Sequence, residues 1–290
     1  MSASACGTAS SEQDLGVPGI PDAGTFSKAQ YAAHITQLRA RLRKLGLGAM
    51  AVRVADPFVV IGDGPIAELE EGASTVRRVA DRLEQGFFAR RPTRIIDVYL
   101  FTDALSYEAG VETLTEERPS TVYGFYSSSR RAMFMNISTG GGTLVHEIVH
   151  PYVEADFPNA PPWLNEGLGS LFEQSGERDD HIVGLTNWRL AGLQRAIRAD
   201  AVPPFRSLTA LGHGAFYDDH SGVHYAQSRY LMYYLQEHGL LREFYRRFRA
   251  ERGEDPTGFQ TLTAVLGESD MTAFQNRWEA YVAKLRFPAE

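Results

Sequence analysis

Two histidines lie four residues apart with a glutamate between them in the segment 146-HEIVH-150. Residues four apart share one face of an α-helix, so His146 and His150 can present their imidazoles to one metal ion. Zn²⁺ binds such nitrogens at about 2.0–2.1 Å and favours tetrahedral sites. Glu147 is turned one step round the helix, where it can reach a zinc-bound water. We expect it to act as the general base for attack of that water on a carbonyl.

A catalytic zinc ion needs a third protein ligand and an open fourth position. Glu166 is the best candidate, because fifteen residues separate it from His150, enough for a loop and a returning helix. It lies in 161-PPWLNEGLGSLFE-173, where Pro162 suits a first helical turn and the following apolar residues give the helix a buried face. The alternative for Glu166 is that an acid near a helix N-terminus only favours the helix dipole.

His-Glu-x-x-His followed by 163-WLNEG-167 resembles the gluzincin clan of zinc metallopeptidases, especially the bacterial peptidase-MA-like proteins. The resemblance implies that His146, His150 and Glu166 hold one zinc ion per chain and that Glu147 is the catalytic base. It implies a zinc metallopeptidase that hydrolyses peptide bonds in a peptide or protein substrate. The resemblance covers about residues 50–285, but only the two motifs are specific.

Gluzincins often use a Tyr or His from their helical lobe to stabilise the oxyanion of the reaction. The segment 220-HSGVHYAQSRYLMYYL-235 resembles that part of the family, which makes Tyr225 the first candidate and His224 the second. A tyrosine that only packs its ring is the alternative for Tyr225. His220 and His213 are weaker candidates.

Proline follows the motif directly, and Pro151 predicts that the helix kinks or stops at His150 instead of running another turn. Metal-bound histidines usually need hydrogen-bond acceptors behind them. Ser170, Asn165 and Glu173 are possible acceptors, and the sequence does not choose among them.

Two further segments could lie near the cleft. The loop 211-LGHGAFYDDHSG-222 could bind a second cation through Asp218 and Asp219, although a solvated turn is the simpler interpretation. The strand 131-RAMFMNI-137 could be the edge that pairs with an extended substrate, with Met135 and Asn136 near the cleft, or an ordinary sheet edge.

The elements that must position these residues follow from the hydrophobic spacing. Besides the two motif helices, helices are predicted over 27–45, 66–87, 103–117, 225–238 and 271–285. Strands are predicted over 49–54, 58–62, 94–101, 121–126 and 131–137, with a hairpin at the first pair and an antiparallel edge at the last.

These elements predict an α+β fold. The resemblance implies a thermolysin-like gluzincin catalytic unit. We expect a disordered tail over residues 1–25 and one catalytic domain over 26–290. That domain divides into a mixed α/β lobe over 26–156 and an all-helical lobe over 157–290, with the motifs at the junction, where clefts form.

Composition limits the partners. The 290 residues carry a formal net charge of −7, which gives no general electrostatic reason to bind nucleic acid. No apolar run is long enough for a transmembrane segment. Residues 4–7, Ser-Ala-Cys-Gly, resemble the end of a bacterial lipobox, so one expectation is an extracytoplasmic protein, secreted or lipid-anchored at Cys6. The alternatives are an incidental cysteine and a cytoplasmic protein.

A second class of function stays open beside the peptidase. The chain could be a metal-stabilised binding or envelope-scaffold protein that keeps the fold without turnover. The presence of all four key residues favours the enzyme. The sequence does not indicate the oligomeric state or the cleavage specificity.

Overall fold

A computed structural model describes residues 25–179, 181–218 and 221–287 of the chain. The predicted N-terminal tail with Cys6 lies outside the described residues, except for Thr25. Asp219 and His220 of the predicted cation loop also lie outside them.

A five-stranded mixed sheet occupies the first half of the chain, in the order β1-β2-β3-β5-β4. Its strands are β1 (Ala51–Ala55), β2 (Phe58–Gly62), β3 (Ile96–Phe101), β4 (Gly124–Ser127) and β5 (Ala132–Asn136). The pairs β1/β2 and β4/β5 are antiparallel, whereas β3 runs parallel to both β2 and β5. The predicted hairpin and the predicted antiparallel edge are confirmed, and the mixed α+β class with them.

The position of β5 corrects one prediction. The segment 131–137 was expected to be the sheet edge, but β5 pairs with β3 on one side and with β4 on the other. The edge is β4, because β5 takes the place next to β3 and the turn at 128–131 leaves β4 paired with β5 alone. Met135 and Asn136 are therefore buried inside the sheet.

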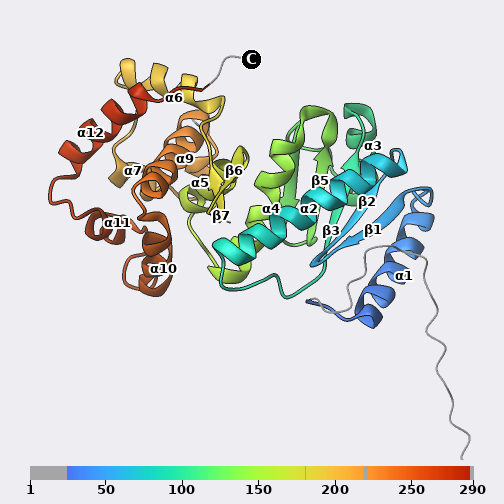
Figure 1. The fold of residues 1–290 in the computed structure, drawn as a ribbon. Helices are drawn as coiled ribbons and strands as arrows, with labels where there is room; N and C mark the ends of the chain where they lie inside the picture. The colour runs from blue at the N-terminus through green and yellow to red at the C-terminus, as the bar shows by residue number, and fades with distance from the viewer. Residues whose placement is uncertain (1–24, 180, 219–220, 288–290) are drawn as a thin grey trace, which may run out of the picture.

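Helices cover both faces of the sheet (Figure 1). One face carries α1 (Lys28–Lys44) and α3 (Ala104–Thr115), and the other carries α2 (Ile66–Gly86) and α4 (Gly141–Asp156). Successive side chains of β3 point to opposite faces of the sheet and so pack against different pairs of helices. Tyr99 and Phe101 pack under α1 and α3, whereas Val98 and Leu100 pack under α2 and α4.

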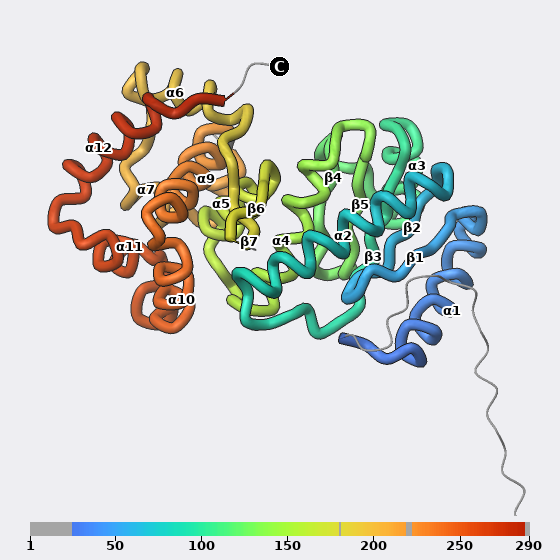
Figure 2. The backbone as a smooth tube through the Cα atoms, in the orientation of Figure 1, coloured from blue at the N-terminus to red at the C-terminus, as the bar shows by residue number. Residues whose placement is uncertain are grey.

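The second half of the chain forms a separate group of helices around α9 (Figure 2). Its helices are α5 (Pro162–Phe172), α6 (Arg189–Arg198), α7 (Phe205–Thr209), α8 (His213–Phe216), α9 (Ser221–Glu237), α10 (Leu241–Glu251), α11 (Phe259–Leu266) and α12 (Met271–Lys284). The helices predicted over 225–238 and 271–285 are confirmed as α9 and α12.

The expectation of an all-helical second half is wrong, because it contains the antiparallel hairpin of β6 (Ser175–Arg178) and β7 (His181–Gly184). The strand β6 has the sequence SGER, which offers no apolar alternation to predict it. Tertiary contacts hold the hairpin instead. Gln236 of α9 bonds both the amide and the carbonyl of Gly184, and Arg82 of α2 pairs with Glu177.

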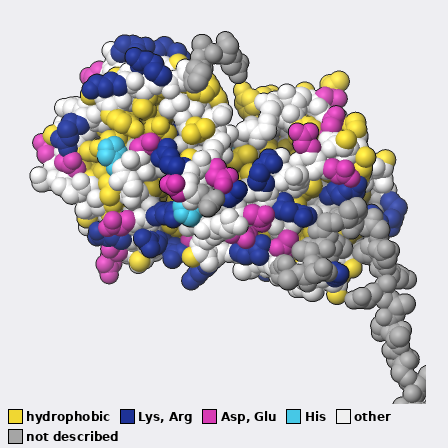
Figure 3. Space-filling model, viewed as in Figure 1, with side chains coloured by type: hydrophobic (Ala, Val, Ile, Leu, Met, Phe, Trp, Pro, Cys, Tyr) yellow, Lys and Arg dark blue, Asp and Glu magenta, His cyan; other side chains and the backbone are white. Residues whose placement is uncertain are grey.

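One hydrophobic core joins the two halves. It runs from the α2/α4 face of the sheet, through Tyr152 and Trp163, to Phe248 and Trp278 in the helical half. On the face drawn in Figure 3, basic and acidic side chains are interspersed, without a large field of one sign. Among the described residues, no helix has both the length and the apolarity that crossing a bilayer requires.

Candidate metal centre

The helix α4 carries the first motif and lines the cleft from the sheet half. It begins after Gly140, whose φ of 102° is a conformation that favours glycine. The rings of His146 and His150 lie on one face with their centroids 4.9 Å apart. The helix continues through Pro151 to Asp156, so the prediction that it runs no further turn after His150 is wrong, whereas the alternative of a kink there stays a prediction. Tyr152, directly after the proline, is fully buried, and such packing offsets the roughly 3 kcal/mol that an interior proline costs.

The helix α5 returns beside α4 and brings the second motif to the histidines. Pro162 occupies its first turn, as predicted, and Glu166 follows one turn later. Close approach depends on Gly169, since a Cβ there would lie 2.9 Å from His146 Nε2. Its neighbour Gly167 allows a similarly close contact with Ser228 of α9. The close packing of α5 against His146 therefore requires glycine at position 169, which was not predicted from the sequence.

Three side chains converge on one point. His146 Nε2 lies 3.0 Å from Glu166 Oε2, and His150 Nε2 lies 3.9 Å from the same oxygen. One ligand atom from each residue lies within 4.8 Å of the other two, and all three residues are buried. Two imidazole nitrogens and one carboxylate oxygen are a donor set that suits zinc. The cluster therefore fits a metal ion, and it is the one such cluster found in the described part of the chain.

The far nitrogen of each imidazole faces a side-chain oxygen. Asn165 Oδ1 lies 3.0 Å from His150 Nδ1, and Glu173 Oε2 lies 3.3 Å from His146 Nδ1. These contacts turn both Nε2 atoms toward Glu166. Of the three possible acceptors, Asn165 is in hydrogen-bonding position and Glu173 in ion-pairing position, whereas no hydrogen-bond partner of the buried Ser170 hydroxyl is found among the described residues.

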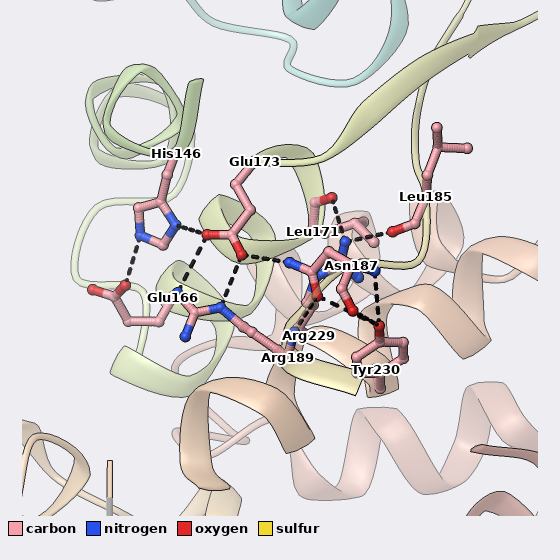
Figure 4. Close-up of polar contacts among 9 residues, drawn as sticks. All are labelled: His146, Glu166, Leu171, Glu173, Leu185, Asn187, Arg189, Arg229 and Tyr230. Carbon is pink, nitrogen blue, oxygen red and sulfur yellow. Dashed lines mark hydrogen bonds and ion pairs between the residues drawn. The ribbon is translucent and has the colours of Figure 1, made fainter. Parts of the chain in front are cut away.

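Glu173, at the end of α5, is itself held by residues that follow it in the chain (Figure 4). Its Oε1 accepts from Arg189 Nε at 2.8 Å and from Asn187 Nδ2 at 2.5 Å. Asn187 is in turn held by Tyr230 of α9, whose hydroxyl accepts from the Asn187 amide. A chain of polar contacts thus connects the imidazole of His146 to α9.

Electrostatics around the cluster favours the ionised forms of Glu166 and His146. Burial raises the pKa of Glu166, but the attraction of His150 and the hydrogen bond with His146 outweigh it and lower that pKa to about 2. Burial lowers the pKa of His146, but Glu166 and Glu173 raise it to about 10. Without a metal, His146 therefore holds a proton between two carboxylates. A metal ion would displace that proton, because only the deprotonated nitrogen can bind it.

Glu147 lies beside the cluster, on the cleft side of α4. Its Oε2 accepts from the backbone amide of Tyr126 in β4 at 2.9 Å and lies 3.6 Å from His150 Nε2. The carboxyl is almost fully buried, and burial is the main cause that raises its pKa. A raised pKa suits a general base working near neutral pH.

Two tyrosines approach Glu166 from the helical half. The hydroxyl of Tyr217 donates to Glu166 Oε1 at 2.5 Å, and the ring of Tyr225 lies 6.3 Å from that of His146. Burial first, and then Glu166, raise the pKa of both hydroxyls, so both remain proton donors. Tyr217 was not among the residues predicted from the sequence, because it follows the four-residue helix α8 and belongs to no motif.

The structure places the second oxyanion candidate elsewhere. His224 turns its Nδ1 to the carbonyl of Phe216 at 2.9 Å and does not line the cleft, whereas Tyr225 does. Asp218, the described acid of the predicted cation loop, has a carboxylate oxygen 3.9 Å from His224 Nδ1. His213 of the same loop lines the cleft.

A cleft of about 1490 Å³ opens over the cluster. The sheet half contributes β4 and α4 to its walls, and the helical half contributes α5, the start of α6, and α9. The cluster and Glu147 lie within it. This volume exceeds the roughly 300–1,000 Å³ of typical small-molecule sites. The space suits part of a polymer.

No protein-family model matches the chain. A search of curated proteins also gives no match.

Proposed function

We propose that this chain is a zinc-dependent peptidase of the gluzincin type that hydrolyses peptide bonds. The observation that carries the proposal is the buried convergence of His146, His150 and Glu166 on one point, with Glu147 beside it in a large cleft. Three protein ligands with one open side are typical of catalytic zinc, whereas structural zinc sites are closed by a fourth. A thermolysin-like arrangement is part of the proposal, supported by a sheet half and a helical half that meet at the motif helices.

His146, His150 and Glu166 would hold the ion, and Asn165 and Glu173 would fix the orientation of the imidazoles. A zinc ion there would polarise a substrate carbonyl and lower the pKa of a water molecule.

Glu147 accepts the proton of the attacking water and later delivers it to the leaving amine. The amide of Tyr126 keeps the Glu147 carboxylate on the cleft side of α4. The hydroxyl of Tyr225, or that of Tyr217, donates a hydrogen bond to the oxygen on which negative charge develops. The strand β4, as the edge of the sheet, offers its outer backbone atoms to an extended peptide.

Cleavage of a quenched-peptide library by the zinc-loaded full chain tests the proposal, with Glu147→Gln as the key variant. Loss of a general base costs about 10²–10⁴ in rate. We expect Glu147→Gln to lose activity by this factor while it retains zinc. Glu112→Gln, an exposed glutamate on α3, is the matched control and should cleave as the wild type does.

Wild-type protein that holds zinc but cleaves no peptide would refute the peptidase and favour a metal-stabilised binding protein. Equal activity in the wild type and in Glu147→Gln would refute the role of Glu147.

A further inference from the structure

Three exposed aromatic side chains in the described part of the chain line the cleft. Among the described residues, Tyr123, Trp188 and Tyr217 line it and are 55%, 63% and 38% exposed. Val122, 60% exposed, directly precedes Tyr123, and the exposed Leu185 donates its amide to the carbonyl of Gln174, a lining residue. Aromatic side chains that line a cleft are typical of binding sites.

The two most exposed rings of the lining lie on different walls. Tyr123 directly precedes β4 in the sheet half, whereas Trp188 directly precedes α6 in the helical half. The guanidinium of Arg189 lies 4.2 Å from the Trp188 ring centroid and is anchored by Glu173. The contacts that orient His146 thus also hold the Trp188 ring in place.

The strand β4 provides a backbone track between these walls. The carbonyl of Tyr123 accepts from Asn136 and so faces β5. The backbone N–H and C=O groups of successive residues point to opposite sides of a strand. Those of Gly124 and Tyr126 therefore point away from β5. The Tyr126 amide donates to Glu147 and so agrees with this, and a peptide would pair with Gly124 and with the Tyr126 carbonyl. A peptide paired along this edge would project successive side chains to the two faces of the extended sheet, with Tyr123 on the strand side of the cleft and Trp188 on the helical side.

Charge does not favour an acidic substrate. Of the described residues that line the cleft, Arg189 is the one Lys or Arg, and Glu173 already pairs with it at 2.8 Å. Glu154, an exposed acid of the lining, accepts hydrogen bonds from Tyr126 and Ser128. A basic side chain near Glu154 is the competing preference.

We propose that the cleft selects extended polypeptide segments with bulky apolar or aromatic side chains on the two sides of the bond that is cut. The inference rests on the proposed function, because it names the substrate class of the same site. Tyr123 and Trp188 act as specificity residues, each on its own wall. Segments of this kind are buried in folded proteins, so unfolded chains and apolar peptides are the expected substrates.

The test compares quenched peptides of one length that differ in the central pair: Phe-Leu, Ser-Gly, Lys-Ser or Asp-Ser. We expect kcat/KM to be at least about tenfold higher for Phe-Leu than for the other three. Trp188→Ala and Tyr123→Ala should each lower the Phe-Leu value about tenfold more than they lower the Ser-Gly value. Trp188→Phe should restore most of the loss. Leu105→Ala, an 80% exposed leucine outside the cleft lining, is the control.

Binding of the same peptides to zinc-loaded Glu147→Gln, measured by fluorescence anisotropy, separates the two proposals. Cleavage without a Phe-Leu preference, a preference for Lys-Ser, or a preference that survives both alanine variants would overturn the substrate class and leave the peptidase standing. Preferential Phe-Leu binding without cleavage by the wild type would overturn the peptidase and leave the selection standing. Absence of both binding and cleavage would overturn both.

Discussion

Replacement of Glu173 by Gln should weaken zinc binding although Glu173 is not a ligand. Its Oε2 lies 3.3 Å from His146 Nδ1, and only 9% of its side chain is exposed. Loss of such a carboxylate behind a ligating histidine costs about 10–100-fold in metal affinity, or roughly 1.4–2.7 kcal/mol. A glutamine oxygen can take the same place 3.3 Å from Nδ1 but lacks the charge, so we expect the lower end, about tenfold.

Competition with a chelator of known affinity measures this change, and urea unfolding of the metal-free proteins measures folding separately. Arg189 would lose its buried counter-charge in the variant, so some loss of stability is also expected. Glu177→Gln is the control, because Glu177 lies four residues further on and pairs at the surface with Arg82. Zinc affinity of Glu173→Gln within twofold of the wild type, at unchanged folding, would refute the role of Glu173.

Two further changes test the packing around the site and the fold. Gly169→Ala should lower zinc affinity at least about tenfold, since its Cβ would displace the His146 ring, whereas Gly192→Ala in α6 meets little and should bind zinc normally; chelator competition compares them. For Asp56, burial raises the pKa, but hydrogen bonds from Tyr31 and Thr25 and the charge of Arg91 together lower it. A lowered folded-state pKa stabilises the fold above the unfolded value, and this stabilisation is lost as pH falls below about 4. Asp56→Asn should therefore lower the free energy of unfolding by about 1–3 kcal/mol at pH 7, with a smaller deficit near pH 3, measured by urea titration; equal deficits at both pH values would contradict the assignment.

The sequence carried enough information to place the motif helices and most of the sheet. Spacings of three and four predicted α1, α2, α9 and α12, and short apolar runs between turn residues predicted the strands. These elements bury continuous apolar faces, so their local pattern and their tertiary packing agree. The convergence of His146, His150 and Glu166 could be predicted because helical spacing and a returning helix leave few other arrangements.

What the sequence could not place depends on tertiary contacts. Local rules for proline predicted a kink or an end of α4 at His150, but the helix runs on to Asp156, with buried packing after Pro151. The hairpin β6–β7 has little apolar pattern and depends on Gln236. Tyr217 reaches Glu166 across 51 positions of sequence, and no local signal indicates such a contact. Gly169 could have been noticed, because glycine in a helix interior often allows close packing.

The zinc content of the purified full-length protein tests the central claim most directly. Elemental mass spectrometry should find about one zinc per chain in the wild type. The double variant His146→Ala/His150→Ala should lose it while retaining the helical circular dichroism of the wild type. Wild-type protein that holds no zinc after zinc is added and the excess is removed would contradict the account, as would a double variant that keeps its zinc.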